Sequence, residues 1–291
     1  MPHIAFLSTD NLEDFFVYDE LLIPHFETLG WQVSTVSWHC QTVDWDSFDY
    51  VIVRSTWDYQ QHAEAFMKCL EDIEQSKAVL FNSLALMQWN IEKYYLRDLA
   101  EKQVPIVETC WHEDYCDTHI DEAFLRFDCD TIVIKPVLSA NADDTFKLHR
   151  NTWREQVTLL SDVFEQRKFM IQPFLDSVVE EGEYSLFYFS GRYSHAIKKV
   201  PQKGDFRVQE EHGGSLFSVN ADTEQQTIAE KALNAMPQNA LYARVDLVRQ
   251  CGQWAIMELE LIEPSLYFNL DSESPKRFVE AMLDLHSSHQ N

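Results

Sequence analysis

The stretch from Leu241 to Phe268, LYARVDLVRQCGQWAIMELELIEPSLYF, decides how the C-terminal part of this chain folds. Two apolar runs flank a short polar turn that contains a glycine, and this pattern predicts a β-hairpin. Three carboxylates lie within the runs, Asp246 in the first and Glu258 and Glu260 in the second. Because side chains alternate along a strand, the two glutamates share one face of the second strand.

The register of the hairpin decides whether Asp246 meets the glutamates. A two-residue turn at Cys251–Gly252 would place Asp246 opposite Met257, on the wrong face. A three-residue loop over Cys251–Gln253, or a bulge equivalent to it, places Asp246 opposite Glu258. We expect this second register.

In the expected register Arg244 lies opposite Glu260, and three carboxylates share one face of the hairpin. Like charges that oppose one another destabilise a sheet unless a cation lies between them. Mg²⁺ takes hard oxygen ligands and commonly shares them with substrate phosphates. The hairpin therefore predicts a Mg²⁺ site, and the alternative is an exposed acidic face on a very acidic protein.

The composition limits what the chain can bind. It has 291 residues, of which 45% are hydrophobic, and a formal net charge of −25 with a sequence pI near 4.6. Such a surface repels nucleic acid and anionic membranes, so we expect neither as a partner. It also repels ATP at long range, so a nucleotide site requires a local cluster of the scarce cations.

The sequence has no targeting signal that we can identify. Its start, MPHIAFLSTD, lacks the basic region and long apolar stretch of a secretory signal. No segment reaches the roughly 18 apolar residues of a membrane span. Six cysteines in such a chain indicate reduced thiols, and we expect a cytoplasmic protein.

Four cysteine and histidine side chains fall within ten residues: Cys110, His112, Cys116 and His119. Side chains of these types bind Zn²⁺. Their spacing matches no common zinc pattern, so a polar loop is the favoured interpretation and zinc is the alternative.

The first part of the chain has the pattern of a small α/β domain. Apolar runs predict strands at His3–Leu7, Trp31–Trp38 and Tyr50–Val53, the last of them fully buried. Helical spacing predicts a helix over Asp14–Leu29, although Pro24 within it allows a kink or two shorter helices. This order of elements predicts a parallel sheet.

Arg54 and Asp58 follow directly after the predicted buried strand. In open α/β sheets, ligands bind beyond the carboxyl ends of the strands. The two side chains are therefore candidates for contact with a substrate. The alternative is an ordinary connecting loop with Asp58 near a helix start.

Apolar periodicity predicts further elements along the chain. Helices are expected at Ala63–Ile73, Ile91–Glu101, Thr223–Met236 and Lys276–Leu285. Strands are expected at Thr131–Pro136, at Phe169–Leu175 and in a second hairpin, Glu183–Val200, with its turn at Ser190–Arg192.

Two lysines occupy positions that suit an anion. Asn90 is the expected N-cap of the helix Ile91–Glu101, so Lys93 falls in the first turn, where it opposes the helix dipole. Lys93 is therefore either solvated or faces an anion at the amide end of the helix. Lys135, near the end of a strand, is either an edge residue that blocks aggregation or an anion ligand.

Basic residues are concentrated at the end of the second hairpin and in the loop that follows it. Four of them fall within ten residues: Lys198, Lys199, Lys203 and Arg207. The loop after Val200 contains Gly204 and is followed by Gly213 and Gly214, and backbone amides beside glycines bind phosphates. The loop predicts contact with a polyphosphate, and the alternative is a solvated basic loop.

Taken in chain order, these features resemble the ATP-grasp superfamily of carboxylate-amine ligases, and in particular its glutathione-synthetase-like members. The matching motifs cover about residues 50–270: Trp-Asn90-Ile-Glu-Lys93, Ile-Lys135-Pro, Ile-Gln172-Pro-Phe-Leu175, Gly182-Glu183, Gly204-Asp205-Phe-Arg207 with Gly213-Gly214, and Asp246 with Glu258-Leu-Glu260. Three other motifs resemble the branch that contains the cyclo-ligase of D-cycloserine biosynthesis: Val-Arg54-Ser-Thr-Trp-Asp-Tyr59, Lys-Pro-Val-Leu-Ser139-Ala-Asn and Glu-Leu-Glu-Leu-Ile-Glu263-Pro-Ser265.

The resemblance implies an ATP-grasp fold of the α/β class. An N-terminal parallel-sheet domain would cover 1–88, and two subdomains, 89–172 and 173–291, would clamp ATP between them. Members of the superfamily are often dimers, so a homodimer is also an expectation.

The resemblance also implies roles for single residues. ATP would be bound by Lys93, Lys135, Gln172, Phe174, Leu175, Glu183 and Ser139. Two Mg²⁺ ions, with Mn²⁺ as a substitute, would be held by Asp246, Glu258 and Glu260. Catalytic roles would fall to Arg207, Lys198 and Arg244, and contact with an amino-acid-like substrate to Arg54, Asp58, Glu263 and Ser265.

The sequence departs from the family pattern at two places. Many members end the metal motif as Glu-x-Asn, whereas this chain has Glu258-x-Glu260, and a carboxylate in that place still ligates Mg²⁺. The loop Ser139–Thr145, SANADDT, contains no glycine, although this loop is often glycine-rich in the family.

These features predict an ATP- and Mg²⁺-dependent ligase. A substrate carboxylate would take the γ-phosphoryl group of ATP, and an amine would attack the acyl phosphate to give an amide or a ring. One alternative is a small-molecule kinase with the same site geometry. The other is a nucleotide-binding protein without enzymatic activity.

Overall fold

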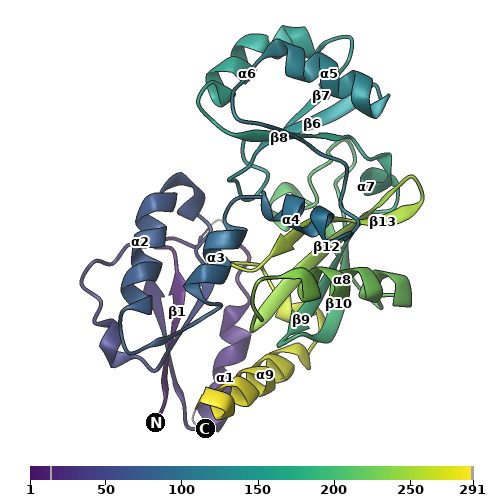
Figure 1. Ribbon diagram of the computed structural model, residues 1–291. Helices are drawn as coiled ribbons and strands as arrows, with labels where there is room; N and C mark the ends of the chain where they lie inside the picture. Colours follow the sequence, from purple (N-terminus) through teal and green to yellow (C-terminus); the bar gives the residue numbers. More distant parts are fainter. Residues whose placement is uncertain (14, 290–291) are drawn as a thin grey trace.

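The computed structural model describes residues 1–13 and 15–289. Its elements form three lobes, each built on a β-sheet of its own (Figure 1). In Figure 1 the N-terminal lobe lies beside the C-terminal lobe, and the central lobe lies above them. Within the described residues, no helix is long and apolar enough to cross a membrane.

The N-terminal lobe is a parallel sheet in the order β2-β1-β3-β4. Its strands are β1 (His3–Ser8), β2 (Gln32–Ser37), β3 (Tyr50–Ser55) and β4 (Val79–Phe81). Helix α2 (Ala63–Glu74) buries Phe66, Leu70 and Ile73 against the sheet, as its periodicity predicts. The predicted parallel sheet is therefore confirmed.

The predicted helix over Asp14–Leu29 is wrong in its first part. The chain forms a 3₁₀ turn, η1 (Asp19–Leu22), and then α1 (Ile23–Thr28), whereas residues 15–18 are not helical. Pro24 lies in the first turn of α1, where its missing N–H costs no hydrogen bond. Shorter helices are thus the observed alternative, and Asp14, the predicted start, lies outside the described residues.

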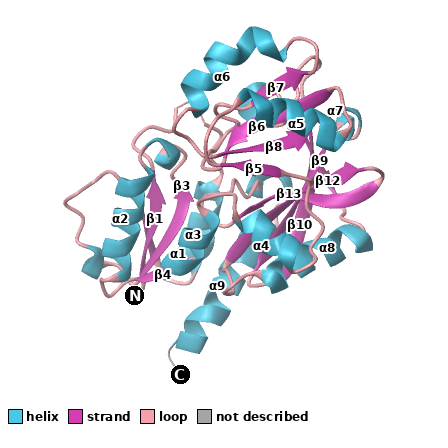
Figure 2. Ribbon diagram, turned by 45° about the horizontal axis from the view of Figure 1, so that its top comes forward, coloured by secondary structure: helices cyan, strands magenta, loops and turns pink. Residues whose placement is uncertain are grey.

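The central lobe is an antiparallel sheet in the order β5-β8-β6-β7. Its strands are β5 (Cys110–His112), β6 (Thr131–Pro136), β7 (Phe146–His149) and β8 (Phe169–Pro173). Helices α5 (Asp117–Phe127) and α6 (Val157–Phe164) cover one face and bury Ile132 and Ile134 (Figure 2). Strand alternation therefore directs Val133 and Lys135 to the opposite face.

The C-terminal lobe is an antiparallel sheet in the order β11-β10-β9-β12-β13. Its strands are β9 (Glu183–Phe189), β10 (Arg192–Val200), β11 (Ser215–Val219), β12 (Tyr242–Gln250) and β13 (Gln253–Glu260). Helix α8 (Thr223–Ala235) packs on the face that carries Val245 and Leu247. Helix α9 (Ser274–His289) packs on the face that carries Tyr242, and it is longer than predicted.

The hairpin of β12 and β13 has the predicted register, with Asp246 opposite Glu258. Its turn, however, has two residues, Cys251 and Gly252, and both have positive φ angles, as a tight hairpin turn requires. A bulge between Asp246 and Leu247 restores the register. The predicted three-residue loop is therefore wrong, and the equivalent bulge is confirmed.

The region around Asn90 differs from the prediction. Helix α3 (Leu84–Asn90) ends at this residue, and α4 (Tyr95–Glu101) begins five residues later. Asn90 is buried, and its amide donates to the carbonyl of Leu259 at 2.9 Å and accepts from the N–H of Leu261 at 3.0 Å. Asn90 is therefore not an N-cap. Its side-chain amide instead forms hydrogen bonds with backbone groups at the end of β13.

Short elements complete the chain. They are η2 (Trp45–Ser47), η3 (Tyr59–Gln61), η4 (Trp153–Gln156), α7 (Asp176–Glu180), η5 (Glu210–His212) and η6 (Phe268–Leu270). In the second hairpin Arg192 pairs with Phe189, so the turn is Ser190–Gly191, one residue shorter than predicted.

Candidate active site

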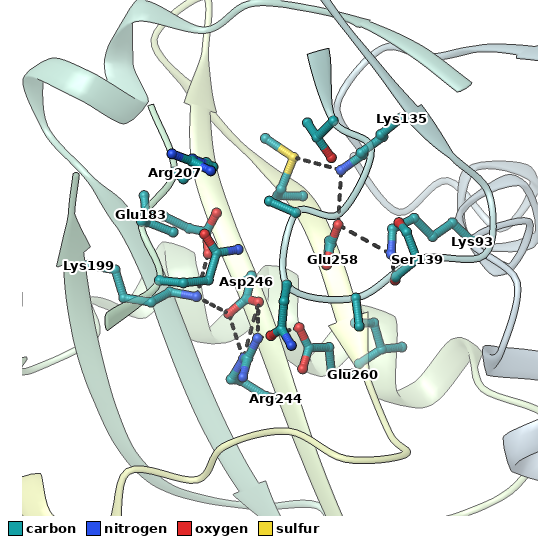
Figure 3. A pocket seen from close by; sticks show the side chains of 18 of the residues that line it. Lys93, Lys135, Ser139, Glu183, Lys199, Arg207, Arg244, Asp246, Glu258 and Glu260 are labelled. Atoms are coloured by element: carbon teal, nitrogen blue, oxygen red, sulfur yellow. Dashed lines mark hydrogen bonds and ion pairs between the residues drawn. The ribbon is translucent and has the colours of Figure 1, made fainter. Parts of the chain in front are cut away.

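A cleft with about 200 Å³ of internal space is lined by residues of all three lobes. Its charged part is formed by β12 and β13, by Lys135 at the end of β6, and by Lys93 between α3 and α4. In Figure 3 the carboxylates and cations of this part point toward one another. The site is therefore assembled from segments that are far apart in the sequence.

Glu258 lies between two lysines (Figure 3). The Nζ atom of Lys135 donates to its Oε1 at 2.9 Å, and Nζ of Lys93 lies 3.6 Å from the same oxygen. Burial opposes the charged form, but the two ammonium groups outweigh it and hold the pKa of Glu258 below its usual range. Glu258 is therefore ionised at neutral pH.

Asp246 is buried on β12 between two further cations. Nη2 of Arg244 lies 3.0 Å from its Oδ2, and Nζ of Lys199 lies 3.5 Å from its Oδ1. The hydroxyl of Ser185 also donates to Oδ1. Burial raises the pKa of Asp246, but Arg244 and Lys199 outweigh burial, so the net pKa is lowered.

The pKa values of two other carboxyls in the cleft are raised, not lowered. Burial, with the charges of Asp246 and Glu258, raises the pKa of Glu260 to about 7, although Arg244 forms an ion pair with it. Burial and the neighbouring Glu260 raise the pKa of Glu263 to about 8. The cleft thus holds carboxyl groups whose pKa values are pushed apart, which is common in sites that move protons.

A second part of the cleft is less charged. Gln172, Phe174 and Leu175 line it at the end of β8 and just beyond. The buried amide of Gln172 donates to Oγ1 of Thr109 at 3.0 Å. Nζ of Lys147 lies 3.5 Å from the centre of the Phe174 ring, a cation–π contact that holds the ring in place.

The first half of the glycine-free loop after β6 is held by two contacts to its backbone. Nζ of Lys93 donates to the carbonyl of Ser139 at 3.0 Å, and His212 approaches the carbonyl of Asn141 at 3.3 Å. Asn141, Ala142 and Asp144 have positive φ angles, which glycine would adopt at lower cost. The loop therefore achieves with non-glycine residues a backbone that glycine usually supplies.

Arg207 lines the cleft from the segment between β10 and β11. Its Nη2 donates to Oδ2 of Asp205 at 2.7 Å and its Nε to Oδ1 at 3.1 Å. These hydrogen bonds hold the pKa of Asp205 well below its usual range. The guanidinium is therefore held at the rim by a neighbour two residues away.

The structure brings most of the predicted site residues together in this cleft. They are Lys93, Lys135, Ser139, Gln172, Phe174, Leu175, Glu183, Arg207, Arg244, Asp246, Glu258, Glu260, Glu263 and Ser265. Arg54, Asp58 and Lys198 do not line it.

Arg54 is buried, and its side chain is used within the protein. Its Nη2 lies 2.8 Å from Oδ1 of Asp19 and donates to the carbonyl of Pro264 at 3.1 Å. Its Nε and Nη2 are thus used within the protein, whereas Nη1 has no hydrogen-bond partner among the described residues. The guanidinium does not line the cleft, and its contact with a substrate stays a prediction.

Asp58 is likewise occupied. Its carboxylate accepts from Nε1 of Trp38 at 2.7 Å and from the hydroxyl of Thr9, and it lies 2.7 Å from Nε2 of His39. Burial opposes ionisation, but these hydrogen bonds lower the net pKa of Asp58. This aspartate ties the loop after β3 to its neighbours and lies outside the cleft.

Lys199, and not Lys198, is the lysine of β10 that lines the cleft. Its Nζ lies 2.5 Å from Oε1 of Glu183. Adjacent residues of a strand point to opposite faces, so only one of the two lysines can enter the site. A signal was available, because Lys199 pairs across the strands with Glu183, which is a predicted site residue, whereas Lys198 pairs with Tyr184.

Aromatic side chains complete one end of the cleft. Trp57, Tyr59 and Tyr267 line it beside Glu263 and Ser265. The predictions above assign them no role. No spacing in the sequence singles them out from the core aromatics, since the lobes bring them together only in the folded chain.

The Cys–His cluster on β5 and α5 has a different character. The rings of His112 and His119 stack with their centres 4.0 Å apart, and Cys116 is exposed. Within residues 1–13 and 15–287, no group of three or more His, Cys, Asp or Glu side chains is arranged to hold a metal ion. The carboxylates of the hairpin do not form such a group either, because each is paired with a lysine or an arginine.

Comparison with solved structures defines the class of protein. The crystal structure of D-cycloserine synthetase DcsG matches with a TM-score of 0.84 and 27% sequence identity, over 97% of this chain and 99% of that one. D-alanine–D-alanine ligase from Bacillus anthracis shares the fold, with a TM-score of 0.68 and 11% identity over 98% of this chain and 97% of that one. This is the fold of the ATP-grasp ligases.

Sequence comparison defines the family more closely. Residues 4–82 match the N-terminal domain of D-cycloserine synthetase DcsG, and residues 116–265 match the ATP-grasp domain of prokaryotic glutathione synthetase. The chain is 28% identical over 270 residues to the cycloserine biosynthesis protein DcsG of Streptomyces lavendulae. This match covers 89% of this chain and 88% of that protein. The chain belongs to the ATP-grasp family of the prokaryotic glutathione synthetase type, in the branch that contains DcsG. It is therefore an ATP-dependent ligase, as the sequence predicts.

Proposed function

We propose that this ligase activates a carboxylate of an amino-acid-like substrate as an acyl phosphate, which an amine then attacks to form an amide or close a ring. One observation carries the proposal. Lys93 and Lys135 of the central lobe face Glu258 across the cleft, and Arg244 and Lys199 flank Asp246 beside it. Such an arrangement suits a triphosphate and a divalent cation next to a carboxylate substrate.

ATP would lie between the central and C-terminal lobes. Lys93, Lys135 and the backbone of Ser139 would meet its phosphates. The less charged wall of Gln172, Phe174 and Leu175 would receive the adenine, and Glu183 the ribose or the adenine edge. The support for this placement is that these residues all line one cleft.

The residues of the hairpin fit Mg²⁺ in the presence of ATP. Asp246 and Glu258 lie opposite one another, and Glu260 follows on the same strand face, so oxygen atoms of the kind that Mg²⁺ prefers are available. Each is paired with a cation, so these carboxylates would hold Mg²⁺ mainly when phosphate oxygens complete its shell. When bound, the ion neutralises phosphate charge and polarises the γ-phosphoryl group. We propose two such ions, with Mn²⁺ as a substitute.

The chain's own residues would then carry out the remaining work. Lys93 and Lys135 neutralise charge on the phosphates, and Arg207 leaves Asp205 to stabilise the transferred phosphoryl group. Arg244 and Ser265 orient the substrate carboxylate, whose oxygen attacks the γ-phosphate in line. No protein nucleophile takes part.

We also propose domain limits at 1–88, 89–172 and 173–291. The three sheets support this division, although β8 reaches Pro173, one residue beyond the second limit. A homodimer remains a prediction, which light scattering of the purified protein would check.

The decisive experiment is a screen of D- and L-amino acids for ADP release in the presence of Mg²⁺, with product masses recorded. Addition of hydroxylamine should trap the acyl phosphate as a hydroxamate. A stable phosphoester, formed without a hydroxamate, would contradict carboxylate activation and favour a small-molecule kinase.

A further inference from the structure

One carboxyl group in the cleft has different partners from the carboxylates of the β12–β13 hairpin. Asp246, Glu258 and Glu260 each form an ion pair with a lysine or an arginine. Glu263 lines the same cleft, but its side chain forms no ion pair in the part of the chain that the structure describes. Its carboxyl interacts instead with the hydroxyl of Tyr59.

The position of Glu263 is fixed through its backbone. Nε1 of Trp57 donates to the carbonyl of Glu263 at 2.9 Å, and Arg54 donates to the carbonyl of Pro264 at 3.1 Å. Arg54 lies near the end of β3 and Trp57 just beyond it, so the N-terminal lobe holds this segment against the end of β13. The carboxyl is thereby held beside Ser265 and Tyr267, at the aromatic end of the cleft.

The surroundings of Glu263 favour the protonated form of its carboxyl, so its carboxylate readily accepts a proton. Burial and the negative charge of Glu260 on β13 raise its pKa to about 8. Tyr59 on η3, Lys93 ahead of α4 and Arg244 on β12 act in the opposite direction without cancelling this effect. A carboxylate of this kind is a stronger base than an exposed glutamate, and its pKa lies near the working pH, where general bases are most effective.

We propose that Glu263 is the proton acceptor for the amine that attacks the acyl phosphate. The inference rests on the proposed function, because it requires both an acyl phosphate and an amine. No other carboxyl that lines the cleft combines a fixed, partly buried position with freedom from a cation within the described residues.

The proposed step balances as follows. An amine arrives as an ammonium group and transfers one proton to the carboxylate of Glu263. The nitrogen lone pair then forms the C–N bond, the bond between the acyl carbon and the phosphate oxygen breaks, and phosphate leaves with the second proton. The amide nitrogen keeps the third hydrogen, and Glu263 returns its proton to solvent after product release.

The test separates activation of the acid from attack by the amine. Glu263→Gln is compared with the wild type, using the acid and amine identified in the screen, and hydroxylamine as a second nucleophile. Hydroxylamine is mostly unprotonated at neutral pH and needs no base, whereas an amine as basic as a lysine side chain is almost fully protonated there. Glu230→Gln, an exposed carboxyl on α8, serves as the matched control.

We expect Glu263→Gln to retain hydroxamate formation and to lose amide formation by about 100-fold or more. Amide formation by the wild type should rise as the pH increases through about 8, and the variant should lack that step. Glu263→Asp, which restores a carboxylate, should recover part of the loss.

Two results would overturn the inference. Equal loss of hydroxamate and amide would assign Glu263 to binding or activation, and loss of neither would remove it from the reaction. If the wild type forms no hydroxamate and releases no ADP with any acid, the proposed function itself fails, and the inference fails with it.

Discussion

Two charged regions were equally good candidates for ligand contact, yet they are built differently. At the end of β3, Arg54 and Asp58 are paired with residues of their own lobe, Asp19 in one case and Thr9, Trp38 and His39 in the other. In the β12–β13 hairpin, by contrast, Glu258 is paired with Lys135 of the central lobe and with Lys93, which precedes α4.

This difference separates a structural ion pair from a binding site. The pairs at the end of β3 lie outside the cleft, so the packing around them closes them and a ligand could enter only by local unfolding. A pair that bridges two lobes across a cleft can exchange one partner for a phosphate or a metal ion. The place of a charged pair, in the cleft or outside it, is therefore more informative than the type of residue.

The largest effect that would test this comparison is expected at the hairpin. Glu258→Gln keeps the size of the side chain but removes the charge that Lys93 and Lys135 face and a proposed Mg²⁺ ligand. We expect turnover to fall by about 100-fold or more, with little change in the circular dichroism spectrum. Normal turnover by this variant would show that the metal assignment is wrong.

The two adjacent lysines of β10 provide a matched pair. Lys199→Met removes the buried cation that pairs with Glu183 and one of the two that pair with Asp246, so the free energy of unfolding should fall by about 3–5 kcal/mol. Lys198→Met, one residue away on the other face of the strand, should change it by less than about 0.5 kcal/mol. Urea unfolding of both variants measures the difference, and equal effects would contradict the assignment of faces.

Arg54 tests the charged region at the end of β3. Arg54→Met leaves the buried carboxylate of Asp19 unpaired and should reduce the free energy of unfolding by about 3 kcal/mol. The KM for the acid substrate should change little, because the guanidinium does not line the cleft. A large rise in KM with normal stability would restore the predicted substrate role.

The sequence sufficed for features that depend on local patterns. Alternation and charge opposition predict the register of the hairpin, and continuous apolar runs predict the parallel sheet. The sequence did not suffice where a residue far along the chain determines what a side chain binds. Asn90 looks like a helix cap, but its amide bonds to β13, about 170 positions away in the sequence. Arg54 looks like a ligand contact, but η1 supplies its carboxylate partner.

The smallest expected effect concerns Asp58. Its pKa is lowered in the folded protein, so its ionised form stabilises the fold above the unfolded pKa of about 3.9, and this contribution is lost as the pH falls below that value. Asp58→Asn should cost about 1 kcal/mol near pH 7. The difference from the wild type should shrink in acid, and a difference that is constant down to about pH 3 would contradict this.

The most direct test of the central claim follows one atom. The acid identified in the screen is labelled with ¹⁸O in its carboxylate and incubated with the enzyme, ATP, Mg²⁺ and the amine. If the carboxylate oxygen attacks the γ-phosphate, one labelled oxygen appears in each released phosphate. Phosphate without label, formed together with ADP and the coupled product, would show that this enzyme does not activate the carboxylate by phosphorylation.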